Sequence, residues 1–226
     1  MHILIIHQAF ASLGEPGGTR HYEFARFLAS RGHQVTVIAS PVSYITGAPT
    51  VAASVGVETP CEGVRILRAR VYSAHHRSFF HRLLAFFSFM FSSFWIGLGV
   101  RNVDVVWGTS PPIFQGVTAW ALARLKRAQF LFEVRDLWPK FAIAVGVLRN
   151  PLLIWLSEWL ERFLYHHADR MMVNSPGFVE HVQSRGAKRV TLIPNAADPE
   201  MFDPQQRGEA FRRAHQLEGK FVVMYA

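Results

Sequence analysis

The sequence has very little cysteine and no recognisable targeting segment. Cys61 is the only cysteine among 226 residues, so an internal disulfide is impossible and a disulfide-rich secreted protein is excluded. A zinc site built on several thiolates is excluded for the same reason. Met1–His7 is a short apolar run without a basic segment before it, which predicts a strand rather than a signal peptide. These features favour a reducing, cytoplasmic environment.

Acidic residues are scarce relative to basic ones. The chain has 24 Lys and Arg against 16 Asp and Glu, a formal net charge of +8. Six arginines and two acidic residues lie between Ser40 and Arg101. Such an excess favours an anionic partner, namely nucleic acid, a membrane surface or a phosphorylated substrate, and it also occurs on a solvated basic face. No aromatic and basic residues alternate as in a nucleic-acid-binding platform, so we expect no nucleic-acid partner.

The hydrophobic residues, half of the chain, alternate between strand-like and helix-like segments. Apolar runs at Ile3–His7 and Val35–Ala39 predict buried parallel strands, with a helix over Tyr22–Leu28 between them and Gly32 as its stop. Further strands are predicted at Val64–Val71, Val103–Trp107, Phe130–Val134, Met171–Val173 and Val190–Ile193, and helices at Phe79–Gly97, Ile113–Leu125 and from Asn150–Pro151 onward. The sequence therefore predicts an α/β fold with a doubly wound, mainly parallel Rossmann-like sheet and helices on both faces.

A last apolar run, Phe221–Tyr225, predicts one more strand. A buried parallel strand needs a neighbouring strand and usually a following helix. We therefore expect residues 1–204 to form one domain. Residues 205–226 are then the linker and the first strand of a second domain.

The longest hydrophobic segment is Leu83–Val100, with eighteen uncharged residues that are rich in Phe. Its length makes it a marginal transmembrane candidate. However, a span would put the strands at Val35 and Val103, which belong to one sheet, on opposite sides of a membrane. Two interpretations remain: a core helix against the sheet, or a helix partly buried in an anionic membrane surface. In the second, the membrane-binding residues are Phe87, Phe91, Phe94, Arg77 and Arg82.

Two pairs of candidate site residues follow predicted strands. Gly17 and Gly18 lie between a strand and a helix, where backbone amides can hold a phosphate, although a plain turn with positive φ explains them too. They do not form the G-x-G-x-x-G dinucleotide motif, which argues against NAD. Arg135 and Asp136 stand at a strand end, where α/β proteins bind ligands. Arg135 is suited to a phosphate and Asp136 to a hydroxyl group, and the alternative is an Arg–Asp pair that fixes the loop.

The histidines give no metal signal. The adjacent pairs His75–His76 and His166–His167 lack the spacing that puts two imidazoles on one helix face. We therefore predict no metal and no cofactor.

Six segments follow one another in a characteristic order: Glu15–His21, Gly32–Val37, Thr109–Pro112, Glu133–Pro139, Asn174–Gly177 and Ile193–Phe202. Together they resemble the N-terminal domain of a retaining family-4 glycosyltransferase. The most similar group is the bacterial fucosamine and amino-sugar transferases of surface-polysaccharide synthesis. The resemblance covers nearly the whole chain.

The resemblance implies the acceptor-side domain of an enzyme with two facing Rossmann-like domains. Such an enzyme moves a sugar, here an N-acetylated amino sugar, from a UDP-sugar to a polyprenyl-diphosphate-linked saccharide in O-antigen and lipopolysaccharide synthesis. It implies a peripheral protein at the inner face of the cytoplasmic membrane. It also implies that Gly17, Gly18 and Arg20 line the substrate cleft, that Asn195 lies in a loop entering it, and that Asp136 is catalytic.

Two consequences of the resemblance concern the limits of this chain. Many family members have His where Arg135 stands, so Arg135 implies a different substrate contact. The family's second domain holds most of the donor, so we expect this chain alone to transfer no sugar. The alternative function is a non-catalytic nucleotide-binding or membrane-associated α/β module.

Overall fold

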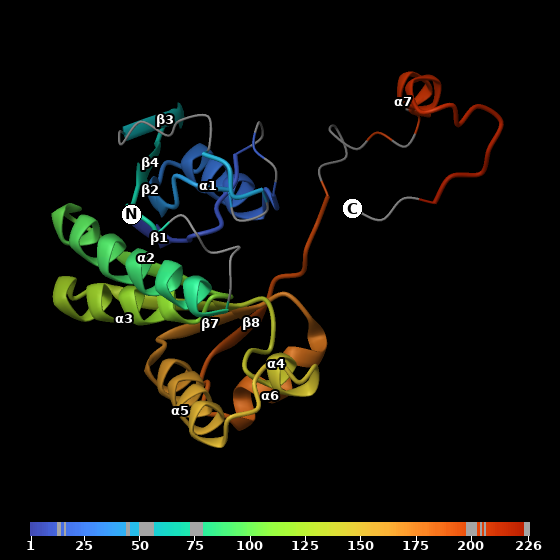
Figure 1. Ribbon diagram of the computed structural model, residues 1–226. Helices are drawn as coiled ribbons and strands as arrows, with labels where there is room; N and C mark the ends of the chain where they lie inside the picture. Colours follow the sequence, from blue (N-terminus) through green and yellow to red (C-terminus); the bar gives the residue numbers. More distant parts are fainter. Residues whose placement is uncertain are drawn as a thin grey trace. The chain divides into compact units, whose positions relative to one another are not determined.

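The computed structural model describes residues 1–12, 15, 17–43, 46–49, 57–72, 79–197, 203, 205 and 207–223. The chain divides into two units, Met1–Pro194 and Asn195–Ala226 (Figure 1). The first unit is an α/β domain. The described part of the second unit contains one short helix, α7 (Glu209–Ala214), which starts after Gly208 in the left-handed conformation.

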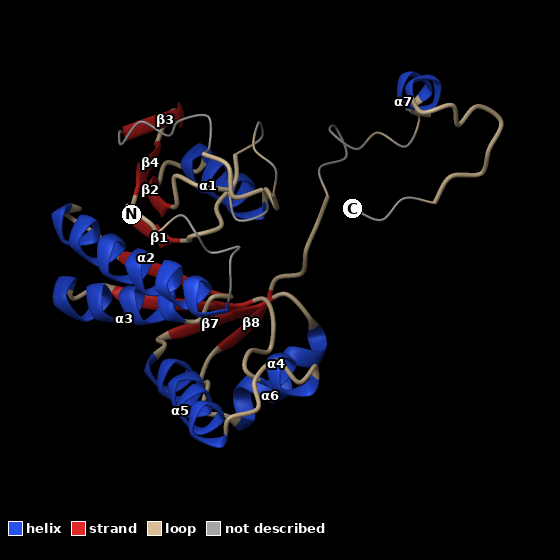
Figure 2. Cartoon of the chain, viewed as in Figure 1, coloured by secondary structure: helices blue, strands red, loops and turns tan. Residues whose placement is uncertain are grey.

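The first unit is built on one eight-stranded sheet with the order β3-β4-β2-β1-β5-β6-β7-β8 (Figure 2). The strands are β1 (His2–Ile6), β2 (Gln34–Ala39), β3 (Val57–Cys61), β4 (Val64–Arg68), β5 (Val105–Ser110), β6 (Gln129–Val134), β7 (Arg170–Val173) and β8 (Val190–Leu192). All neighbours pair in parallel except β3, which runs antiparallel to β4. The predicted doubly wound, mainly parallel sheet is thus confirmed.

Six helices lie in the described part of the same unit. They are α1 (Arg20–Ser30), α2 (Phe79–Gly99), α3 (Phe114–Lys126), α4 (Lys140–Ala144), α5 (Pro151–His167) and α6 (Pro176–Ser184). The period of two along a strand sends alternate side chains to opposite faces. In β1, Ile3 and Ile5 join the apolar cluster that contains residues of α1, whereas Leu4 and Ile6 join the cluster that contains residues of α2, α3, α5 and α6. Helices therefore cover both faces, as predicted.

Local signals place the helix ends well. The side chain of Asn150 accepts hydrogen bonds from the backbone amides of Leu152 and Leu153 at 2.9 and 3.2 Å, with Pro151 as the first residue of α5. Gly32 has a φ of 80° just after α1, which is the left-handed conformation expected of a glycine beyond a helix end.

Two elements and one predicted strand differ from expectation. β3 and α4, each five residues long, were not predicted. Phe221–Val223 form no strand, and Met224 onward lies outside the described residues. A strand requires a hydrogen-bonded neighbour, and no described residue after β8 supplies one.

Helix α2 has one buried and one exposed face. Ala85, Phe89 and Ser93 follow one another at intervals of four residues and are buried. Gly97 lies so close to Leu122 of α3 that a side chain there would overlap it, and Thr118 donates a hydrogen bond to the carbonyl of Met90 at 2.9 Å. Consequently, α2 and α3 pack side by side (Figure 1).

The exposed face of α2 is an apolar stripe, which we define as Phe80, Leu84, Phe87, Phe91, Trp95 and Leu98. Phe91 is 60% and Trp95 70% exposed. By length and composition α2 is the one described helix that is long and apolar enough to cross a membrane. However, α2 connects β4 to β5, and both strands belong to the same sheet, so it is a crossover helix with an uncovered apolar side.

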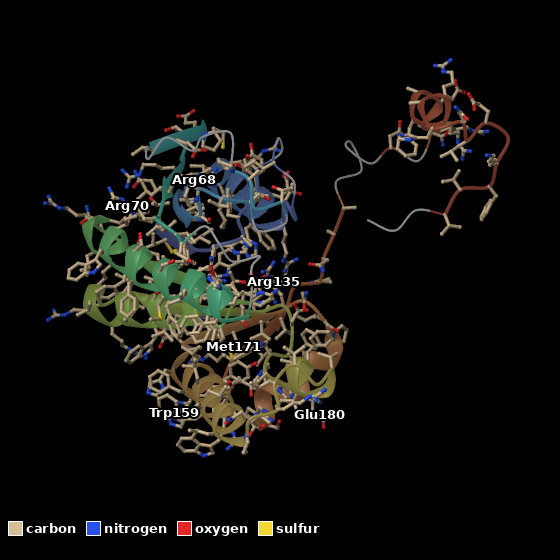
Figure 3. All side chains as sticks on the ribbon, in the orientation of Figure 1. Arg68, Arg70, Arg135, Trp159, Met171 and Glu180 are labelled. Carbon is tan, nitrogen blue, oxygen red and sulfur yellow. The ribbon has the colours of Figure 1, made fainter. Side chains whose placement is uncertain are left out.

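Helix α5 also exposes large apolar side chains near its start. Leu164 is buried against the sheet, whereas Leu152, Trp155 and Trp159 are more than half exposed. Figure 3 shows Trp159 on the outer side of α5. Thus only part of the apolar surface of α5 contributes to the core.

Candidate functional site

The candidate site is a cavity of about 520 Å³ at the carboxyl ends of β1, β5 and β6. The chain leaves β1 toward β2 on one side and leaves β5 toward β6 on the other, so the sheet order reverses between β1 and β5. Loops diverge at such a reversal and leave a crevice where α/β proteins bind ligands. The cavity contains five of the predicted site residues: Gly17, Gly18, Arg82, Arg135 and Asp136.

The loop that contains Gly17 and Gly18 is fixed by a close steric contact and by an ion pair. Gly17 has a φ of 148°, and a Cβ atom there would lie 2.8 Å from the Cβ of Ala11. The turn therefore requires glycine at this position. One carboxylate oxygen of Glu15 accepts a hydrogen bond from the amide of Ser12 at 2.8 Å, and the other lies 3.0 Å from Arg68. The turn with positive φ is confirmed for Gly17, and the same loop lines the cavity, while phosphate binding by its amides stays a prediction.

Arg135 and Asp136 stand at the end of β6. One terminal nitrogen of Arg135 donates a hydrogen bond to the carbonyl of Pro111 at 3.3 Å, while its buried Nε has no hydrogen-bond partner among the described residues. Burial lowers the pKa of Arg135, against the opposing attraction of Glu133 and Asp136. Asp136 is exposed in the cavity wall. The cavity wall thus contains a guanidinium, that of Arg135, next in sequence to an accessible carboxylate. Figure 3 shows the position of Arg135 in the domain.

A buried ionic cluster that was not predicted lies on β6 and α1. Glu133 is fully buried, and its carboxylate contacts His21 at 2.5 Å and Arg20 at 3.1 Å. The remaining nitrogens of Arg20 donate to the carbonyls of Ile193 and Pro194 at 2.7 and 2.8 Å. The three nitrogens of the Arg20 guanidinium are therefore all hydrogen-bonded within the domain, and Arg20 does not line the cavity. The signal in the sequence was the charged Glu133 inside an otherwise apolar strand.

The protonation of this cluster follows from its burial. Burial lowers the pKa of His21 and outweighs the opposing attraction of Glu133. Burial alone would raise the pKa of Glu133, but His21, Arg20 and Arg135 together hold it below its usual range. At neutral pH Glu133 is thus ionised and His21 is neutral, donating its Nε2 hydrogen to the carboxylate. The pKa of His7, whose ring lies 4.1 Å from that of His21, is lowered well below its usual value by burial, His21 and Arg135.

The other predicted site residues are placed as follows. Asn195 belongs to the second unit, and Arg77 lies outside the described residues. Phe87 and Phe91 are on the apolar stripe, whereas Phe94 packs against the core cluster and Trp95 takes the exposed position. Among the described residues, no three His, Cys, Asp or Glu side chains are grouped as a metal site.

One arginine of the basic region is not available to a partner. Arg68 is 3% exposed and forms ion pairs with Glu15 at 3.0 Å and Glu58 at 2.7 Å, and it donates to the carbonyl of Ser40 at 2.9 Å. Arg70, two residues on, is exposed. Figure 3 shows both on the β4 side of the sheet. Part of the excess of basic residues is therefore buried inside the domain and is not exposed to a partner.

Comparison with known proteins defines the class. The model of the glycosyl transferase 4-like domain family matches residues 17–196, and the chain therefore belongs to this family. A search of curated proteins finds no match. The matched segment includes Gly17 and Gly18 at its start and Arg135 and Asp136 about two thirds of the way along it.

Several solved structures share this fold. Sucrose-phosphate synthase from Thermosynechococcus elongatus is 15% identical, with a TM-score of 0.67 over 96% of this chain and 52% of its own. UGT89C1 from Arabidopsis thaliana in complex with UDP is 15% identical, with a TM-score of 0.56 over 87% of this chain and 49% of its own. HepE from Anabaena in complex with UDP-glucose is 12% identical, with a TM-score of 0.53 over 96% of this chain and 50% of its own. The chain thus spans about half the length of these structures.

Proposed function

We propose that this chain is the acceptor-side domain of a retaining glycosyltransferase. In this proposal the enzyme moves an N-acetylated amino sugar from a UDP-sugar to a polyprenyl-diphosphate-linked saccharide in surface-polysaccharide synthesis. The observation that carries the proposal is the strand-end cavity, in which Gly17, Gly18, Arg135 and Asp136 meet. Family membership supports glycosyl transfer, and UDP or a UDP-sugar is bound in two of the similar structures.

Each residue of the cavity has a role in this proposal. Asp136 is accessible and polarises the acceptor hydroxyl as a general base or hydrogen-bond acceptor. Arg135 lines the cavity, where its guanidinium can hold a phosphate through charge-assisted hydrogen bonds, and such bonds are strong where water is excluded. At Gly18 the main chain lets a ligand approach closely, because the position of the missing Cβ atom is open, whereas Gly17 is required by the turn itself. Neither a metal nor a cofactor is required for these roles.

The apolar stripe of α2 supports a peripheral membrane location at the inner face of the cytoplasmic membrane. A row of exposed aromatic and aliphatic side chains on one helix face is typical of interfacial helices. Arg82, at the start of the same helix, is exposed and suited to anionic lipid headgroups. A lipid-linked acceptor would be reached from such a surface.

The test is a transfer assay with the longest form of the protein that its gene encodes. UDP-linked sugars and a synthetic polyprenyl-diphosphate saccharide are supplied, and the configuration of the new bond is determined by NMR. Asp136→Asn should lower turnover by roughly 10²- to 10⁴-fold. Glu180→Gln, which removes an exposed carboxylate from α6, is the matched control and should leave turnover unchanged.

Three outcomes would contradict the proposal in different ways. Inversion of configuration would refute the retaining mechanism. If Asp136→Asn lowered thermal stability along with turnover, Asp136 would be a residue that fixes the loop rather than a catalytic one. Binding of UDP without any transfer would favour the non-catalytic nucleotide-binding module instead.

A further inference from the structure

The lining of the strand-end cavity has an unusual chemistry for a sugar site. Most of it is hydrocarbon, contributed by Phe10, Leu83, Phe86, Ile113, Phe114 and Trp138, among others. Its charged side chains are few, and Glu15 is already paired with Arg68. Saccharides need many hydrogen-bond partners, because a polar group buried without one costs free energy. The apolar part of the cavity wall is therefore better suited to a hydrocarbon chain than to a sugar ring or a nucleobase.

The cavity mouth is apolar as well. Phe141, Val145 and Val147, on α4 and just after it, line the cavity and yet are 65%, 53% and 62% exposed. On the other side, Leu83 and Phe86 of α2 line the cavity, and Phe87, the next residue, belongs to the apolar stripe. The ring of Phe87 lies 4.8 Å from that of Phe114, which lines the cavity. Apolar surface is thus continuous from the stripe of α2 into the cavity.

Besides Glu15, which is paired with Arg68, the charged residues of the lining are two arginines and one carboxylate, Asp136, so a net positive charge is left for an anionic head group. Arg82 and Arg135 both line the cavity, and the buried Nε of Arg135 has no partner within the described part of the chain. A hydrophobic pocket with a few convergent polar groups is the usual form of a small-molecule site, and about 520 Å³ is within the usual range of ~300–1,000 Å³.

We propose that this cavity binds the first part of an isoprenoid chain together with the diphosphate that it carries. The inference rests on the proposed function and deepens it, because it places the lipid of the acceptor inside the domain rather than only in the bilayer. Hydrocarbon fills the pocket between α2, α3 and α4, and Arg135 and Arg82 bind the diphosphate. The chain of the lipid leaves through the apolar mouth beside α4.

The experiment compares farnesyl diphosphate, at concentrations where it is monomeric, with inorganic diphosphate and with farnesol. Binding to the 226-residue chain is measured by calorimetry. We expect farnesyl diphosphate to bind at least tenfold more tightly than either partial ligand. Equal affinity for farnesyl diphosphate and inorganic diphosphate would overturn the hydrocarbon site, and equal affinity for farnesyl diphosphate and farnesol would overturn the head-group assignment.

A pair of matched variants separates the cavity from the apolar stripe. Ala142 lines the cavity, whereas Ala144, on the same short helix, is exposed and does not line it. Ala142→Trp fills the cavity and should weaken farnesyl diphosphate at least tenfold without changing inorganic diphosphate, and Ala144→Trp should change neither. If Ala142→Trp left farnesyl diphosphate unaffected, the ligand would be adsorbed elsewhere and the proposal would fail.

A second pair of variants tests the head group. Arg82→Gln removes a cavity arginine, and Arg101→Gln removes an exposed arginine that does not line this cavity. We expect only the first to weaken farnesyl diphosphate, with a smaller loss at high salt because the charge is screened there. Equal effects of the two variants would show general electrostatic attraction and contradict the assignment of Arg82.

Because these measurements use binding alone, they are independent of the transfer assay. Tight binding of farnesyl diphosphate without glycosyl transfer would refute the proposed function and leave the cavity assignment intact. Transfer to a lipid-linked saccharide, without tighter binding of farnesyl diphosphate than of the partial ligands, would support the proposed function and refute the cavity assignment.

Discussion

Replacing two aromatic residues of the apolar stripe tests whether α2 binds membranes. The double variant Phe91→Ser/Trp95→Ser removes side chains that are 60% and 70% exposed. Large aromatic side chains can each bury ~150–250 Å², so the two present roughly 260 Å² to solvent. If half of this area enters the bilayer at about 25 cal/mol per Å², the loss is about 3 kcal/mol. Membrane affinity should therefore fall on the order of 100-fold.

The assay is sedimentation with vesicles of phosphatidylcholine, with and without phosphatidylglycerol. Wild-type binding should need the anionic lipid and should weaken with salt, since the Debye length is about 10 Å at 0.1 M. The control Phe27→Ser removes an exposed phenylalanine of α1 and should retain binding. In contrast, Phe89→Ser alters the buried face of α2 and should cost about 3–5 kcal/mol of folding stability.

Two results would refute this reasoning. If the double variant at Phe91 and Trp95 bound vesicles like the wild type, the stripe would not be the membrane contact. If it unfolded as Phe89→Ser does, the stripe would be part of a core that the exposed fractions do not reveal.

Three further predictions concern stability and the site. Arg68→Gln should lower the free energy of unfolding by about 3–5 kcal/mol, measured by urea denaturation, because it leaves two carboxylates without their buried partner. Because the folded pKa values of His7, His21 and Glu133 are all lowered, the unfolded state binds more protons on acidification and stability should fall below about pH 6.5. His7→Phe should remove up to about 1.4 kcal/mol per pH unit of that dependence, and a dependence equal to the wild type would contradict the buried neutral histidine. Asp136→Asn should change stability by less than ~0.5 kcal/mol, and a larger loss in thermal denaturation would assign it a structural role.

The order of elements was predictable because strong local signals mark it. Short apolar runs gave the parallel strands, Asn150 and Pro151 gave the start of α5, and Gly32 gave the end of α1. β3 and α4 were missed, because five residues are too few to show a clear period. β3 also contains Pro60, which is unusual inside a strand and tolerated at a sheet edge.

The candidate site was partly predictable. Arg135 and Asp136 directly follow a strand, and this position alone indicates a ligand-binding edge. The ion pair between Arg20 and Glu133 could not be predicted, since the two residues are far apart in the sequence. The sequence also did not reveal that Trp95, rather than the predicted Phe94, lies on the exposed face of α2. This helix is apolar on all sides and lacks a polar face that would fix its orientation.

The hydrogen bonds of Arg20 have a mechanical consequence. By binding the carbonyls of Ile193 and Pro194, Arg20 ties the end of the α/β domain to its first helix and, through Glu133, to β6. The segment after Pro194 therefore begins at residues that hydrogen bonds hold to the α/β domain. A force on that segment would pass through Arg20 and Glu133 to β6, the strand that is directly followed by the cavity residue Arg135.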